Sequence, residues 1–288
     1  MCDQHDFDNM QKQQELSRRQ FGALGFGAGV VAMLPAVANA ADVKESEVSI
    51  KTPDGNCDAH FVHPVSGATA AVLVWPDIFG LDDDFRRMGK RLAESGYAVL
   101  TVNPFYRLQK APTSAKGASF QDPATREALM KQAGSLSATT NVTDAKAFVA
   151  WLDSQSAVSK SRKIGTTGYC MGGPMVMRTA ATIPNRIGAG ASFHGGGLNT
   201  NDANSPHLLI PQMKANFLIA IAANDDASNP ESKNVLRKAF ADAKLKAEIE
   251  VYEGAQHGWC PPDSQVYNQV QAEKAWARLL ALFKTSLA

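Results

Sequence analysis

Cys170 stands in a setting that could make it a nucleophile. The segment TTGYCMGG flanks it with Gly168 and Gly172, where a predicted strand over residues 163–168 turns into a helix over 173–183. This is the form of the G-x-S-x-G nucleophile turn, with cysteine in place of serine. So tight a turn leaves no room for side chains at the two glycine positions, and the N-terminus of the following helix stabilises a thiolate. The competing interpretation is a buried structural thiol, the commonest state of an unpaired cysteine.

The groups that such a nucleophile needs follow further along the chain. Enzymes with this turn carry their triad in the order nucleophile, acid and base. The segment NFLIAIAANDDASNP supplies Asp225 or Asp226 after a predicted strand, and EIEVYEGAQHGWC supplies His257 after the last predicted strand. We interpret Cys170, one of these aspartates and His257 as a catalytic triad, because an imidazole oriented by a carboxylate can accept the thiol proton. The chain has no G-x-S-x-G segment, which argues against a serine hydrolase.

The remaining histidines do not indicate a metal site. The HGGG segment that begins at His194 resembles an oxyanion motif of lipases, but there the motif precedes the nucleophile, whereas here it follows Cys170. We interpret it as a turn that could line the pocket. No cysteines and histidines have the spacing of zinc ligands, and the predicted chemistry needs neither a metal nor an organic cofactor. The histidines outside the predicted triad are His5, His60, His63, His194 and His207.

Alternating strands and helices must position these groups. Their order predicts an α/β protein with a mostly parallel sheet that helices cover on both faces. The predicted strands are a hairpin of 47–51 with 57–62, followed by 70–75, 97–102, 163–168, 187–193, 216–222 and 247–252. The predicted helices are 83–96, 142–153, 173–183, 231–243 and a last one that ends near residue 283, and we expect an irregular stretch after residue 102. We expect one domain over residues 41–288.

Residues 1–40 are typical of a twin-arginine export signal. The segment SRRQF around Arg18 and Arg19 precedes an apolar run with four glycines, and Ala38-Asn39-Ala40 forms a cleavage motif. The apolar run is shorter than the roughly 20 residues that span a membrane. We therefore expect export to the periplasm by the Tat machinery, with no stable membrane anchoring after cleavage.

The net charge limits the classes of partner, and the number of cysteines limits how they can pair. The 288 residues carry a net charge of +1 at pH 7, so nothing indicates a nucleic-acid or membrane-surface partner. Cys57, Cys170 and Cys260 remain beyond the predicted signal. Three cysteines cannot all pair, so at least one stays a thiol in an oxidising compartment. A disulfide between Cys57 and Cys260 is one arrangement that the sequence leaves open.

These motifs resemble those of the dienelactone hydrolase family, the carboxymethylenebutenolidase-like α/β-hydrolases, over roughly residues 45–285. The family's G-x-C-x-G-G turn is matched around Cys170. Its acid segment is best matched by AAND, which ends at Asp225 and favours the first of the two aspartates. Its His-Gly-Phe/Trp segment is matched by HGW, from His257 to Trp259. The resemblance implies the α/β-hydrolase fold.

The resemblance also implies roles for further residues. The segment VLVWPDIFG has Asp77 where the best-known members have a glutamate that contacts the thiol, and FYR supplies Arg107, which would pair with Asp77 and face a substrate carboxylate. Trp259 would bind substrate or tune the thiol. The alternatives are a plain loop aspartate and a surface arginine. The arginine that follows the catalytic histidine in the dienelactone enzymes is absent, because GWCPP stands there.

The predicted function is hydrolysis of a small-molecule ester or lactone through an acyl-enzyme on Cys170. Backbone N–H groups of Met171 and Ile78 would bind the oxyanion. The alternative from another class is a periplasmic binding or thiol redox-sensing protein on the same fold, which would use Cys170 without turnover.

Overall fold

An eight-stranded, mostly parallel sheet forms the centre of the protein. The computed structural model describes residues 33–288, so the predicted twin-arginine motif lies outside the described residues. The strands lie in the order β1-β2-β4-β3-β5-β6-β7-β8. They are β1 (Val43–Thr52), β2 (Gly55–Pro64), β3 (Ala71–Trp75), β4 (Ala98–Val102), β5 (Ile164–Tyr169), β6 (Ile187–Phe193), β7 (Asn216–Ala222) and β8 (Ala247–Tyr252). β1 and β2 form the predicted antiparallel hairpin, β2 pairs antiparallel with β4, and the strands from β4 to β8 run parallel.

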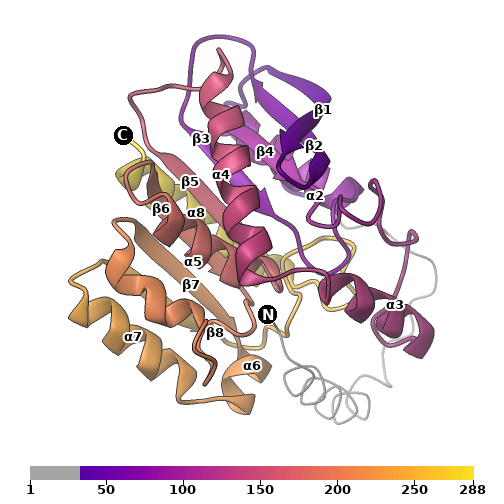
Figure 1. Ribbon diagram of the computed structural model, residues 1–288, viewed down its shortest axis with the longest axis vertical. Coiled ribbons are helices and arrows are strands. Elements are labelled where there is room, and N and C mark those ends of the chain that lie inside the picture. Colours follow the sequence, from indigo (N-terminus) through magenta and orange to yellow (C-terminus); the bar gives the residue numbers. More distant parts are fainter. Residues whose placement is uncertain (1–32) are drawn as a thin grey trace.

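Helices cover both faces of this sheet, as the sequence predicts (Figure 1). One face packs against α4 (Ala138–Ser154), α5 (Gly172–Thr182) and α7 (Ser232–Asp242), which contribute Phe148, Val176 and Leu236 to its core. The other face packs against α2 (Asp83–Glu94) and α8 (Gln269–Ser286), in a separate core that contains Phe85 and Leu279. The central strands β3, β4 and β5 are buried along their whole length, because helices lie on both sides of them.

The residues with predicted chemistry follow the carboxyl ends of different strands. Asp77 follows β3, Cys170 follows β5, Asp225 follows β7 and His257 follows β8. Parallel strands end at the same edge of a sheet, and that edge is where ligands bind in open α/β folds. The fold therefore gathers residues from four distant segments at one edge.

The structure contains elements that the sequence patterns did not predict. The stretch predicted as irregular holds α3 (Pro123–Ala133), which begins after Asp122, whose side chain accepts from the Thr125 amide. Helix α4 starts four residues before its predicted start because Ser137 and Thr140 form a reciprocal capping box. Two further short elements were not predicted: a 3-10 helix, η1 (Pro206–Gln212), and a helix, α6 (Ala223–Ser228).

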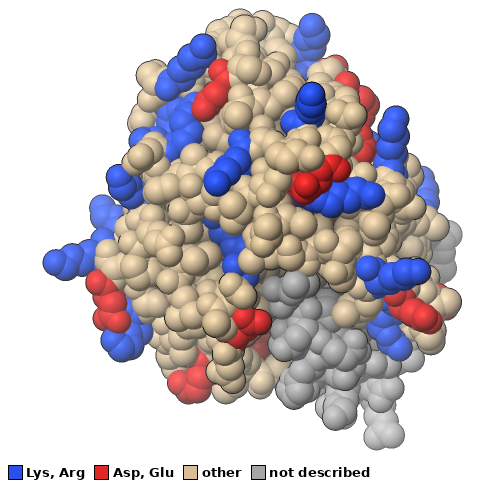
Figure 2. Space-filling view, viewed as in Figure 1, with Lys and Arg blue, Asp and Glu red and all other residues tan. Residues whose placement is uncertain are grey.

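Charged side chains of both signs are scattered over the face of the molecule that Figure 2 shows. Lys and Arg side chains are scattered over this face, several of them beside Asp or Glu (Figure 2). Within residues 33–288, no helix is long and apolar enough to cross a membrane.

Candidate active site

Cys170 occupies a strained turn between β5 and α5. Its φ angle is 50°, in the left-handed region that side chains other than glycine seldom adopt. Its amide donates to the carbonyl of Phe193, at 3.0 Å, and to Nδ1 of His194, at 3.1 Å. Both acceptors come from the end of β6, so the neighbouring strand holds the backbone of Cys170 in this conformation. Strain of this kind is typical of functional sites.

The flanking glycines are required by close backbone approach. A Cβ at Gly168 would lie 2.3 Å from the carbonyl oxygen of Gly172, and a Cβ at Gly172 would lie 2.3 Å from that of Trp75. Real Cβ atoms essentially never come so close to backbone, so neither position admits a side chain without a shift of the chain. This confirms the reason that the sequence pattern suggested for the two glycines. It also shows that the start of α5 lies directly against the end of β3.

Asp225 and His257 are hydrogen-bonded at the same edge of the sheet. Nδ1 of His257 lies 2.8 Å from Oδ2 of Asp225, and the His257 amide donates to Oδ1 of Asn224 at 2.8 Å. The neighbouring Asp226 turns instead to Nζ of Lys233, at 2.6 Å. The structure therefore distinguishes the two aspartates as the sequence motif did, because only Asp225 orients the histidine.

His194 is a site residue that the sequence analysis missed. Its imidazole is fully buried, and its Nδ1 accepts from the Cys170 amide, so the ring proton lies on Nε2. Burial, with the nearby His257, holds the pKa of His194 well below its usual range, so the ring stays neutral. Its ring meets that of His257 edge to face, with centroids 5.1 Å apart. His194 thus contacts both the predicted nucleophile's backbone and the predicted base.

The sequence did contain a signal for His194. It is the first residue after β6, the strand beside β5, so the carboxyl-edge rule places it next to the Cys170 turn. The turn interpretation of HGGG is compatible with this position, since Gly195 packs against Gly173 at the start of α5. What the pattern could not supply was the direction of the imidazole, which points into the protein.

Trp259 is a packing residue rather than a substrate contact. Its indole is 0% exposed, stacks on Tyr252 with centroids 5.2 Å apart, and meets His194 edge to face at 5.0 Å. Of the two roles expected for Trp259, direct contact with substrate is contradicted, because the side chain has no exposed surface. Its contact with His194 makes it a support of that ring.

Asp77 is a buried carboxyl close to the site. Its Oδ1 accepts from the Phe79 amide at 2.9 Å, within the turn that follows β3. Burial raises the pKa of Asp77 well above its ordinary value, the charge of Asp82 raises it further, and His257 opposes the shift. The carboxyl is consequently favoured in its neutral form, which can donate a hydrogen bond.

Replacing Asp77 with asparagine should alter the pH dependence of stability. A carboxyl whose pKa is higher in the folded chain contributes fully below its unfolded pKa, about 4, and that contribution is lost as the pH rises through the folded pKa. The free energy of unfolding of the wild type should therefore fall, relative to that of Asp77→Asn, as the pH rises above about 4. Urea unfolding at a series of pH values measures this difference. A difference that stays constant with pH would contradict the buried neutral carboxyl.

Two backbone amides beside Cys170 are available as donors. Within the part of the chain that the structure describes, the N–H groups of Ile78 and Met171 donate to no acceptor. Gly172 lies against the carbonyls of Trp75 and Pro76, which brings the start of α5 next to the loop that carries Ile78. The arrangement suits a two-donor site for an oxyanion, as predicted from the sequence.

Arg107 does not pair with Asp77, contrary to the expectation from the family resemblance. Its guanidinium forms a bidentate pair with Asp144, at 2.7 and 2.8 Å, and a further pair with Asp54 at 2.6 Å. Asp144 belongs to α4 and Asp54 to the turn of the hairpin, so Arg107 ties these elements together. Its donors are engaged by carboxylates of the protein itself.

Cys57 and Cys260 do not form the disulfide that the sequence left open. Both are thiols, and they lie in the two separate cores on opposite faces of the sheet. Burial raises the pKa of each thiol, which disfavours the reactive thiolate. A redox role that depends on this pair is therefore not supported. Cys170 is also largely buried, at 6% exposure, and the next residue, Met171, lines a cavity.

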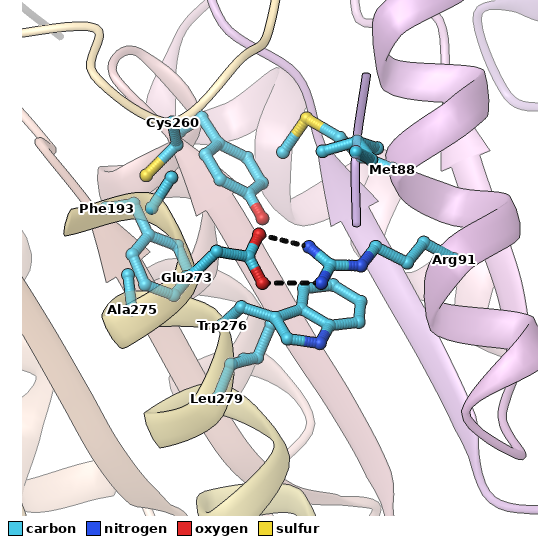
Figure 3. Close-up of a pocket in the computed structure, with 11 residues that line it drawn as sticks. Met88, Arg91, Phe193, Cys260, Glu273, Ala275, Trp276 and Leu279 are labelled. Carbon is cyan, nitrogen blue, oxygen red and sulfur yellow. Dashed lines mark hydrogen bonds and ion pairs between the residues drawn. The ribbon is translucent and has the colours of Figure 1, made fainter. Parts of the chain in front are cut away.

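Two cavities differ in what they could hold. The first, of about 30 Å³, lies between α2 and α8, where Arg91 forms a bidentate pair with Glu273 over Trp276 (Figure 3). It has room for about one water molecule and none for an ester. The second, of about 910 Å³, is lined in part by Met171 and α5. Within residues 33–288, no group of three or more His, Cys, Asp or Glu side chains could hold a metal ion.

Comparisons with known proteins agree with this geometry. The sequence model of the dienelactone hydrolase family matches residues 57–287. A protein of Synechocystis sp. named "Putative carboxymethylenebutenolidase" is 26% identical over 250 residues, which cover 85% of this chain and 98% of the relative. The carboxymethylenebutenolidase of Rhodococcus opacus is 25% identical over 244 residues, which cover 82% of this chain and 90% of the relative.

A solved structure supports the same architecture. The "Putative Dienelactone Hydrolase" of Klebsiella pneumoniae superposes with a TM-score of 0.72 at 23% identity, over 85% of this chain and 99% of that one. Together with the sheet order and the strand–turn–helix segment at Cys170, this likeness identifies the fold as the α/β-hydrolase fold.

Proposed function

The chain belongs to the dienelactone hydrolase family and is a carboxylic ester hydrolase of that type, and we propose that it cleaves small-molecule esters or lactones through a thioester acyl-enzyme on Cys170. The hydrogen bond between His257 and Asp225, at 2.8 Å, carries this proposal. It stands at the same sheet edge as the strained Cys170 turn, and the neutral ring of His194 contacts both the Cys170 amide and the His257 ring.

Acylation begins with the thiol. Because Asp225 occupies Nδ1 of His257, the other ring nitrogen, Nε2, is the one that accepts the proton of Cys170. The sulfur attacks the carbonyl carbon, and the electron pair of the carbonyl moves to the oxygen. The amides of Ile78 and Met171 bind that oxyanion. When the oxyanion collapses, the alkoxide leaves with the proton from His257, and a thioester remains.

Deacylation reverses the roles. A water molecule gives its proton to His257 and attacks the thioester carbonyl, and the same two amides bind the second oxyanion. Collapse expels the Cys170 sulfur, which regains the proton from His257. With a lactone the alkoxide stays attached to the acyl group, so one molecule of hydroxy acid is the product.

The nucleophile and its neighbours limit the classes of substrate that we propose. A thiolate is both a better nucleophile and a better leaving group than an alkoxide, which suits reactive lactones and activated esters better than amides. The family's arginine after the histidine is absent, and Arg107 is held by Asp54 and Asp144. The proposal therefore does not extend to dienelactone itself.

Turnover of a substrate panel tests this function. Purified protein should hydrolyse p-nitrophenyl acetate and at least some small lactones, and mass spectrometry of quenched reactions should find the acyl group on the peptide that contains Cys170. The same reactions after thiol alkylation serve as the control. Absence of turnover on every ester and lactone, or turnover that survives alkylation, would contradict the proposal.

We also propose that the chain is exported by the twin-arginine route. The SRRQF motif supports this, and Ala38-Asn39-Ala40 forms an exposed turn just ahead of β1, where a peptidase can reach it. In a reporter fusion that carries residues 1–45, the Arg18→Lys, Arg19→Lys double variant should abolish export to the periplasm. Unchanged export of that variant would argue against this route.

A further inference from the structure

One face of α5 leads from the Cys170 turn into the large cavity. Met171, Pro174, Met175 and Arg178 all line the cavity of about 910 Å³. They are spaced three, one and three residues apart, so they lie on one side of the helix. From Met171 to Arg178 the helix rises about 10 Å. The cavity therefore begins beside a predicted oxyanion donor and continues to an arginine one and a half to two turns away.

Arg178 differs from Arg91, the other buried arginine of the described chain, and from the partly buried Arg107. Arg91 and Arg107 each form a bidentate pair with a carboxylate. Arg178 is as buried as Arg91, with 8% of its surface exposed, yet within residues 33–288 no carboxylate lies within 4 Å of its guanidinium. One bond is made, from Nη2 to the carbonyl of Asn204 at 2.7 Å.

A buried guanidinium without a carboxylate is costly to maintain. Transfer of a charge out of water is unfavourable unless the charge is paired and hydrogen-bonded. Burial accordingly lowers the pKa of Arg178. Asp202, which lines the same cavity but forms no ion pair with Arg178, opposes that shift. The guanidinium has five N–H donors, arranged in a planar fork that matches a carboxylate. Because only one of these donors is used by the Asn204 carbonyl, the others can bind a ligand in the cavity.

We propose that Arg178 binds a carboxylate at the far end of the substrate, while the ester or lactone carbonyl lies at Cys170. This inference rests on the proposed function and names its substrate class. Leu136 and Val235 contribute apolar surface to the cavity, Asn199 and Asn201 contribute amides, and Asp202 contributes a carboxylate. The substrate that fits is an ester or lactone with a segment several bonds long between its reacting carbonyl and a terminal carboxylate.

Matched esters that differ only in charge test the proposal. Mono-p-nitrophenyl adipate carries a carboxylate where p-nitrophenyl hexanoate carries a methyl group, and the ester of 6-(trimethylammonio)hexanoate carries a cation. The wild type should prefer the adipate ester over the hexanoate ester by about 10- to 100-fold in kcat/KM, the effect expected of a hydrogen-bonded charge pair. It should disfavour the cationic ester. Succinate and suberate half-esters would define the preferred length.

Two variants of Arg178 and one control variant test whether the preference for the carboxylate ester depends on this residue. Arg178→Gln should lower kcat/KM for the adipate ester to the level of the hexanoate ester and leave the hexanoate ester within about threefold, and Arg178→Lys should restore part of the preference. Arg237 of α7 is the matched control, because it donates to the carbonyl of Ile249 outside the cavity. Arg237→Gln should leave kcat/KM for both esters unchanged. Thermal unfolding of each variant reports whether it folds.

A binding measurement separates this inference from the proposed function. Calorimetry with adipate on Cys170→Ala should give binding that the Arg178→Gln change removes, and this result supports the anion site even if no ester is turned over. Equal kcat/KM of the wild type for the adipate and hexanoate esters would overturn the inference. The inference would also be overturned if Arg178→Gln lowered kcat/KM equally for both esters. Adipate binding to Cys170→Ala that the Arg178→Gln change does not weaken would overturn it as well.

Discussion

Cys170→Ala is expected to lower kcat/KM for p-nitrophenyl esters by about 10³-fold or more, because removal of a nucleophile abolishes the covalent route and leaves what the oxyanion donors and binding supply. The steric effect of the change is small, since the β-carbon remains and the glycines around the turn are untouched. Initial rates over a range of ester concentrations measure the loss. Quenched reactions of this variant should also lack the acyl adduct.

The other two cysteines of the described chain supply the controls for this experiment. Cys57→Ala and Cys260→Ala remove buried thiols, one from each of the two cores. Each should lose some stability, because it leaves a small cavity, and keep its kcat/KM within a few-fold of the wild type. If Cys170→Ala retains wild-type turnover, or if alanine at position 57 or 260 abolishes it, the assignment of the nucleophile is wrong.

Asp225→Asn should have the second largest effect, a loss of about 10²- to 10⁴-fold in kcat. The carboxylate holds Nδ1 of His257 in its protonated form, which directs the other nitrogen toward the thiol proton. An asparagine amide can instead donate to Nδ1 and stabilise the wrong tautomer. The side chains have nearly the same shape, so the fold should be preserved, and circular dichroism checks this.

Asp226→Asn is the matched control for that change. Asp226 is the next residue in the chain and has the same side chain, but it pairs with Lys233 at 2.6 Å rather than with the histidine. Its neutralisation should therefore leave kcat within a few-fold of the wild type. The pH profile adds a further readout, because loss of the Asp225 carboxylate should move the pH at which the base becomes active and loss of Asp226 should not. Equal effects of the two changes would refute the role of Asp225.

Local sequence patterns were sufficient for the elements that carry the site. The Cys170 turn is specified by residues that are neighbours in the chain, and its glycine requirement follows from the tightness of the turn alone. Asp225 and His257 could be placed because each follows a predicted strand, and the carboxyl ends of parallel strands share one edge. The hairpin and the two-sided helical cover were predictable for the same reason, since the periods of strand and helix are local properties.

Side-chain partners from distant segments were beyond such patterns. Arg107 was expected beside Asp77 but pairs with Asp54 and Asp144, and the choice among these carboxylates depends on how the hairpin packs against α4. Trp259 was expected at the substrate and is fully buried. In both cases the motif identified the position in the fold, while the packing of other elements around that position determined what the side chain contacts.

What the amino-acid sequence by itself determined is an α/β chain, and it predicted a thiol nucleophile, an acid and a base in the order of a hydrolase, because those features depend on spacing along the chain. Tertiary structure decided that His194 accepts from the Cys170 amide and that the buried Arg178 lines the cavity along α5 without forming an ion pair. The physical reason is that burial and pairing depend on atoms contributed by segments far apart in the sequence, which only the folded chain brings together.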